Sequence, residues 1–87
     1  MPITLVHLRG ALDRVRRGDL GTFKDQSLNR YVVDPRDDEP WDLKPVVGLA
    51  LELAGEPVMW GQVRLTSDNL QSRLRKDLPE IKVLTFQ

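Results

Sequence analysis

Large apolar residues alternate with small or polar ones along Val46–Leu65, and this alternation predicts a β-hairpin at the centre of the chain. Successive side chains on a strand point to opposite faces, so one face of the first arm would carry only large apolar groups. A three-residue loop at 55–57 continues that apolar face into the second arm, where it meets Met59, Val63 and Leu65. A shift by one residue would turn every side chain over, so the pattern selects this register.

Residues 46–54 also fit a buried helix, with Pro45 as its first residue and Gly55 as its stop. Glu52 would be the only charged residue of that helix. Such a helix needs burial on nearly every side, which a chain of 87 residues can hardly provide. We therefore favour the hairpin and keep the helix as the alternative.

A first amphipathic helix is predicted over residues 4–17. Its apolar residues recur at spacings of three and four, Thr4 can cap its start, and Gly18 follows its basic last turn. Gly10 weakens this helix. It marks either a close contact with the sheet or a break after a short strand at residues 3–8.

A second helix is predicted over residues 68–78. The polar segment Thr66–Asn69 offers an N-cap, and Pro79 prevents continuation. The apolar residues of its single face are spaced by four: Leu70, Leu74 and Leu78.

Two further strands and two loops complete the predicted elements. Residues 30–33 (RYVV) are rich in β-branched and aromatic side chains, and residues 80–86 (EIKVLTF) carry apolar groups on both faces. Residues 19–29 are expected to form a loop. Residues 34–45 hold three prolines and five acidic residues, so a second and longer loop is expected there.

The sum of these elements is an α+β fold in the order α-β-β-β-α-β. It would be a two-layer sandwich, in which a mainly antiparallel four-stranded sheet carries both helices on one face. The length of 87 residues indicates a single domain, 1–87. Hydrophobic residues make up 40% and charged residues 30% of the chain, so neither a disordered nor a membrane protein is expected. The first residues do not resemble a secretory signal, and a cytoplasmic location is expected.

The charges are segregated although the net charge is zero: residues 1–24 carry +3, residues 25–56 carry −5 and residues 57–87 carry +2. The acidic loop, with Asp34, Asp37, Asp38, Glu39 and Asp42, lacks the spacing of a calcium loop. It is therefore interpreted as a solvated loop, or as one that docks on a basic surface through Trp41. Whether it holds a cation is left open.

No residue pattern indicates catalysis, a cofactor or a metal site. The chain has no cysteine, and its one histidine, His7, has no acidic residue at helical spacing. His7 is expected to face solvent or to cap the first helix. The sequence thus predicts a protein that is not an enzyme and needs no cofactor.

The predicted function is protein–protein association, most simply between copies of this chain. In the favoured register Trp60 stands on the solvent face of the hairpin, and an exposed tryptophan is typical of a contact surface. The predicted partner-binding residues are Trp60, Glu52, Gln62, Arg64 and Trp41. The size of the oligomer is left open.

A nucleic-acid-binding module is the alternative function. Each predicted helix has a short basic edge, and two such edges on one side of the molecule would contact phosphates. The residues concerned are Arg14, Arg17, Arg73 and Lys76.

Overall fold

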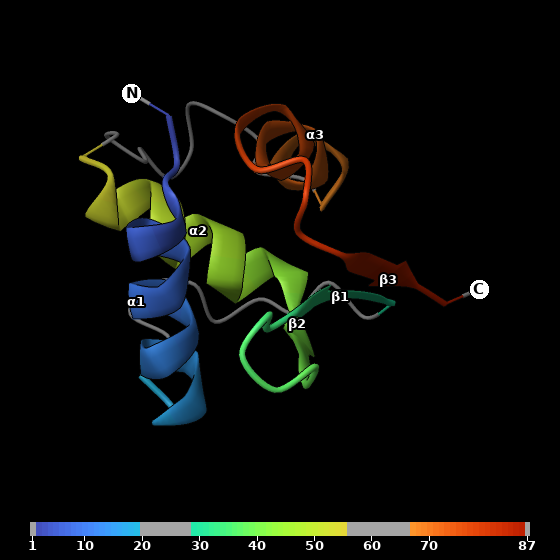
Figure 1. Ribbon diagram of the computed structural model, residues 1–87, viewed down its shortest axis with the longest axis horizontal. Coiled ribbons are helices and arrows are strands. Elements are labelled where there is room, and N and C mark those ends of the chain that lie inside the picture. The colour runs from blue at the N-terminus through green and yellow to red at the C-terminus, as the bar shows by residue number, and fades with distance from the viewer. Residues whose placement is uncertain (1, 20–28, 56–66, 87) are drawn as a thin grey trace.

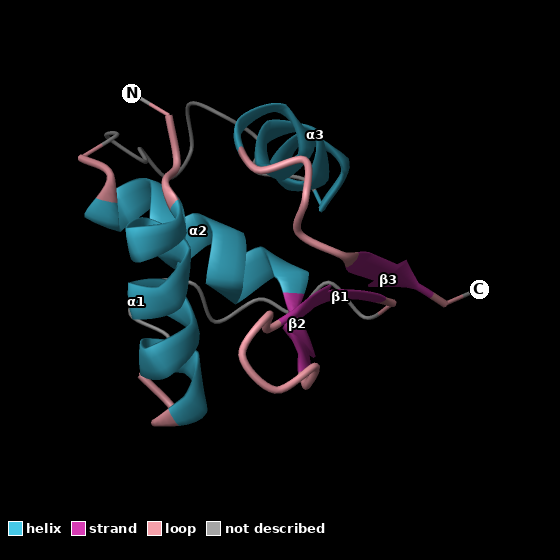
Figure 2. Ribbon diagram, in the orientation of Figure 1, coloured by secondary structure: helices cyan, strands magenta, loops and turns pink. Residues whose placement is uncertain are grey.

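Figure 1 shows the computed structural model of the chain, which describes residues 2–19, 29–55 and 67–86. Within these ranges the chain forms an α+β fold of three helices and a three-stranded antiparallel sheet. The second helix crosses the middle of the molecule between the other two, and the sheet lies at the end where that helix begins (Figure 1, Figure 2). The elements are α1 (Leu5–Arg16), β1 (Arg30–Val33), β2 (Pro40–Asp42), α2 (Leu43–Leu53), α3 (Ser67–Asp77) and β3 (Val83–Thr85).

The centre of the fold is a helix, so the predicted hairpin is wrong in its first arm. Residues 46–53 belong to α2, which begins after Asp42, whose side chain accepts a hydrogen bond from Lys44 N–H at 3.2 Å. Pro45 lies in the first turn, where a missing N–H costs nothing. Gly55 follows the helix with a φ of 83°, a left-handed conformation that suits glycine. The second arm, residues 58–65, lies outside the described residues.

The helix forms because the fold supplies burial on nearly every side, which a chain of this length was not expected to provide. All residues from Pro45 to Leu51 are buried, with α1 packed on one side of α2 and α3 on another, while β1 lies beside its start. Glu52 and Leu53, in the last turn, are exposed. A helix that is apolar on all sides is stable only in such a setting.

Helix α1 confirms the first predicted helix and excludes a strand at residues 3–8. Thr4 and His7 form a capping box, in which Thr4 N–H donates to His7 Nδ1 at 3.1 Å and the Thr4 side chain accepts from His7 N–H. The buried stripe is Leu8, Ala11, Leu12 and Val15. Gly10 marks a close approach to α2 rather than to the sheet, because a Cβ placed there would lie 3.0 Å from Leu53 Cδ1.

Helix α3 confirms the second predicted helix to within one residue at each end. Leu70, Leu74 and Leu78 are all buried, as the spacing of four predicts. Near its end, Asp77 accepts hydrogen bonds from Ile3 N–H at 2.8 Å and from Arg73 Nε at 2.8 Å. The start of the chain is thereby fastened to the end of α3.

The described sheet has the order β2-β1-β3, so the predicted four strands and the predicted element order are not confirmed. The order within the described residues is α-β-β-α-α-β. β1 matches its predicted bounds, and β3 is shorter than predicted. β2 was expected to be loop, but Pro40 starts this edge strand opposite Val33, where the ladder needs no N–H donor.

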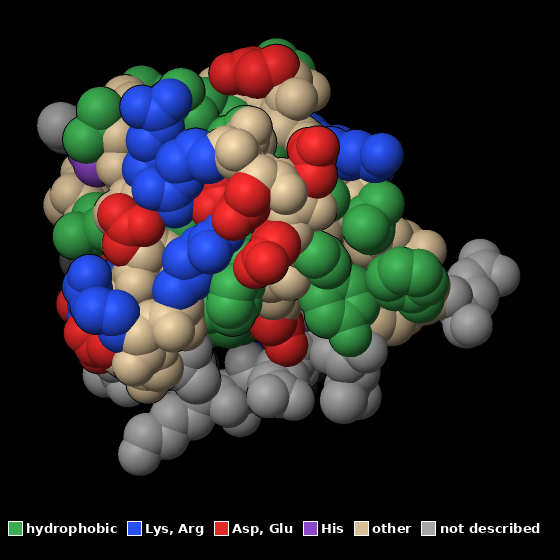
Figure 3. Space-filling view, turned by 60° about the horizontal axis from the view of Figure 1, so that its bottom comes forward, with side chains coloured by type: hydrophobic (Ala, Val, Ile, Leu, Met, Phe, Trp, Pro, Cys, Tyr) green, Lys and Arg blue, Asp and Glu red, His purple; other side chains and the backbone are tan. Residues whose placement is uncertain are grey.

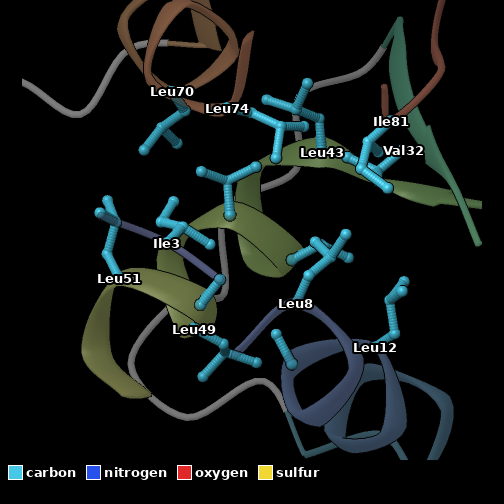
Figure 4. Packing of buried hydrophobic residues seen from close by; sticks show 14 of the residues in the cluster. Ile3, Leu8, Leu12, Val32, Leu43, Leu49, Leu51, Leu70, Leu74 and Ile81 are labelled. Carbon is cyan, nitrogen blue, oxygen red and sulfur yellow. The ribbon is translucent and has the colours of Figure 1, made fainter. Parts of the chain in front are cut away.

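The hydrophobic core lies between the helices and one face of the sheet. Figure 4 shows side chains of α1, α2 and α3 meeting Ile3, Val32 and Ile81 around α2. Trp41 and Val83 pack against this core from the outer strands and are partly buried. The core therefore uses the sheet face that carries Val32 and Val83.

Candidate functional site

The outer face of the sheet carries an apolar group that is not part of the core. Tyr31 and Leu84 are direct partners across β1 and β3, and they point away from the core face because their neighbours Val32 and Val83 point into it. Phe86, two residues after Leu84, lies on the same side. Its ring makes an edge-to-face contact with Tyr31, with centroids 5.6 Å apart at 70°. We call Tyr31, Leu84 and Phe86 the outer apolar face.

Phe86 is the most open part of this face, since 57% of its surface is exposed. Its backbone is nevertheless fixed, because its N–H donates to Asn29 O at 2.8 Å. Figure 3 shows hydrophobic side chains gathered at the side of the molecule where β3 and the C-terminus lie. An aromatic side chain held by its backbone and open to solvent is a typical contact group at protein interfaces.

The outer apolar face adjoins a free strand edge. Val33 N–H donates to Lys82 O, and Phe86 N–H donates to Asn29 O. Lys82, Leu84 and Phe86 therefore direct their backbone N–H and C=O groups toward β1. The N–H and C=O groups of Val83 and Thr85 must then point away from β1. Among the residues that the structure describes, no strand pairs with this edge.

A second feature is a charged network around Asp34, a fully buried residue with 0% of its surface exposed. Arg36 donates from Nε to Asp34 Oδ1 at 3.0 Å and from Nη2 to Oδ2 at 2.8 Å. Arg16 of α1 adds a hydrogen bond from Nη2 to Oδ2 at 3.0 Å. The hydrogen bonds from the Arg36 side chain, helped by those from Arg36 N–H and Arg16, outweigh burial and lower the pKa of Asp34 to about 2.

The network continues to the surface and ties α1 to the β1–β2 connection. Arg16 also pairs with Asp37 and Glu39, and Arg36 pairs with Asp13 at 2.9 Å. Each of these two arginines thus pairs with at least two acids of the same chain. The arrangement holds the β1–β2 connection against the end of α1.

The predicted acidic loop is therefore largely an intramolecular clamp. The basic surface on which it docks is the end of α1 in the same chain. Within the described ranges, no group of three or more histidine, aspartate or glutamate side chains has the geometry to hold a metal ion.

The structure distributes the predicted partner-binding residues over different elements. Trp41 lies in β2, half-buried, with the guanidinium of Arg16 5.0 Å from its ring centroid. Glu52 is exposed in the last turn of α2, not on a sheet face. The other three predicted residues, Trp60, Gln62 and Arg64, fall outside the described residues. The contact face predicted on the solvent side of a central hairpin is therefore not formed, because the first arm of that hairpin belongs to helix α2.

The two predicted basic edges do not meet. Figure 1 shows the end of α1, with Arg14 and Arg17, at the opposite side of the molecule from α3. Arg14 pairs with Asp19 at 3.1 Å, and Arg73 pairs with Asp77 at 2.8 Å. Burial raises the pKa of Asp77, but the hydrogen bonds from Ile3 N–H and from the Arg73 side chain together outweigh it, so the pKa of Asp77 is lowered. Arg17 and Lys76 are exposed.

Sequence reasoning missed the outer apolar face, although one signal for it was present. Residues 80–86 carry apolar groups on both faces, and such a strand needs cover on both sides. The ion pair of Asp34 with Arg16 had no comparable signal, because Arg16 is brought to it from a separate element.

None of the helices in the described part of the chain is both long and apolar enough to cross a membrane. Comparison with protein-family models, curated proteins and solved structures gave no match.

Proposed function

We propose that this protein is not an enzyme and acts by associating with another protein chain through the outer apolar face of its sheet. The observation that carries the proposal is Phe86, which is anchored through its N–H yet 57% exposed beside Tyr31 and Leu84. Burying such a ring releases about 2 kcal/mol of hydrophobic free energy, which makes it an effective anchor for a partner.

The other described candidates for chemistry are engaged within the fold. His7 is part of the capping box of α1, and Asp34 is held by Arg16 and Arg36. The Nδ1 atom of His7 and both carboxylate oxygens of Asp34 are thus used within the fold. The contact surface is therefore a more direct basis for function than a reaction.

A photo-reactive side chain tests the proposal at the residue that carries it. Phe86→p-benzoylphenylalanine, expressed in the cells that make the protein, should form a covalent adduct with a protein chain when illuminated. Val6→p-benzoylphenylalanine is the matched control, because Val6 is 75% exposed but lies on α1, away from the sheet. Peptide mass spectrometry then identifies the chain that is attached at position 86.

An adduct at position 86 that is missing at position 6 supports association through this face. Equal labelling at both positions, or no adduct at position 86, would refute it. Thermal unfolding of the unilluminated variants verifies that both keep the wild-type fold.

A further inference from the structure

Only one of the two outer edges of the described sheet is ready to accept another strand. At the edge formed by β2, Pro40 has no N–H to donate, and Asp42 is already the cap of α2. At the edge formed by β3, both Val83 and Thr85 direct an N–H and a C=O away from β1. An incoming strand would therefore add beside β3.

We infer that the occupant of this edge is β3 of a second copy, paired antiparallel about a twofold axis at Leu84. This inference rests on the proposed function and names the partner. In that register Val83 of one copy faces Thr85 of the other, and each pair exchanges both of its N–H···O=C bonds. No other antiparallel register uses all the outward groups of β3 within the strand itself. The two sheets join into one.

The side chains suit the same register. Leu84 of each copy meets Leu84 of the other in the closely spaced, non-hydrogen-bonded pair, on the outer apolar face. Phe86 stands across from Lys82 of the second copy, an exposed cation with a long apolar stem. Such a cation over an aromatic ring is attractive. On the other face, Val83 meets Thr85, and two β-branched side chains make a favourable cross-strand pair.

The first test is the mass of the purified full-length chain in solution, measured by sedimentation equilibrium. The wild type should have twice the mass of the chain. Thr85→Pro removes the N–H that points outward and breaks no hydrogen bond to β1. The dissociation constant of the dimer should therefore rise at least tenfold. Thr85→Ala keeps that N–H and should remain dimeric, which makes it the matched control.

A charge-swap test addresses the twofold axis itself. Leu84→Glu and Leu84→Lys each place like charges opposite each other in the dimer, so each variant alone should be monomeric. An equimolar mixture should form a heterodimer, which native mass spectrometry separates from homodimers by mass. Circular dichroism of each variant alone checks that its helices are retained.

The inference is overturned if the wild type is monomeric up to its solubility limit. It is also overturned if Thr85→Pro dimerises like Thr85→Ala, or if mixing the Leu84 variants restores no dimer. The proposed function fails separately, when the probe at position 86 captures no protein. A probe at position 86 that captures a different protein, together with a monomeric wild type, supports the proposed function and refutes the twofold dimer.

Discussion

Arg36 closes on the carboxylate of Asp34, two residues before it in the chain, with its Nε and Nη2 atoms bonded to separate carboxylate oxygens at 3.0 and 2.8 Å. The backbone N–H of Arg36 adds a third bond, at 2.9 Å. This fork-to-fork geometry is specific to arginine. Because Asp34 also reaches Arg16 of α1, one buried carboxylate links the sheet to the first helix.

Asp34→Asn is expected to lower the free energy of unfolding by about 2–3 kcal/mol, because it removes the buried carboxylate that accepts charged hydrogen bonds from Arg16 and Arg36. Urea denaturation followed by circular dichroism measures the change. Asp38→Asn is the matched control in the same connection, since Asp38 is exposed with a φ of 60°, which asparagine adopts readily. A loss of equal size in both variants would contradict a special role for Asp34.

The unfolding free energy should fall as the pH drops from about 4 to about 2. Hydrogen bonds from Arg36 lower the pKa of Asp34 from 3.8 to about 2, so its stabilising effect is complete above pH 4 and lost on acidification. Urea titrations at several pH values test this. Asp34→Asn should flatten the profile without levelling it, because the pKa of Asp77 is lowered too. An unchanged slope in the variant would refute the assignment.

Gly10→Ala should raise the unfolding free energy by less than the roughly 1 kcal/mol that alanine gains over glycine in a helix interior. The new Cβ would lie 3.0 Å from Leu53 Cδ1, and Leu53, which is 43% exposed, has room to turn away. Removing that side chain should restore the full gain, so a Gly10→Ala and Leu53→Ala double-mutant cycle should show coupling. Additive effects would mean that α1 and α2 do not touch at this point.

Thr4→Ala should cost about 1 kcal/mol of unfolding free energy by removing the side-chain acceptor of the α1 cap. Thr4→Ser keeps the acceptor and should change stability by much less. Thermal unfolding monitored at 222 nm compares the two variants. If both lose equally, the methyl group of Thr4, and not its hydroxyl, is what matters.

Elements with a single clear periodicity were predictable from the sequence. The spacing of leucines gave both outer helices, and the β-branched run gave β1 with its observed bounds. The β2 strand was missed because three prolines argued for a loop, whereas Pro40 occupies an edge position that needs no donor. For the candidate site, the apolar groups on both faces of residues 80–86 indicated that a second face needs cover. That Leu84 pairs with Tyr31 on this face could be known only from the register of the sheet.

The sequence by itself determined which residues would be buried at the centre: Val47, Leu49 and Leu51 were predicted on the apolar face of a hairpin, and they are buried in the helix as well. It did not determine that backbone. A segment apolar at nearly every position satisfies both the strand period and the helix period, so local pattern cannot choose between them. Only the tertiary structure decides, because α1, α3 and β1 pack around the segment and bury all of residues 45–51. A helix can use burial on several sides, whereas a hairpin with one solvent face cannot.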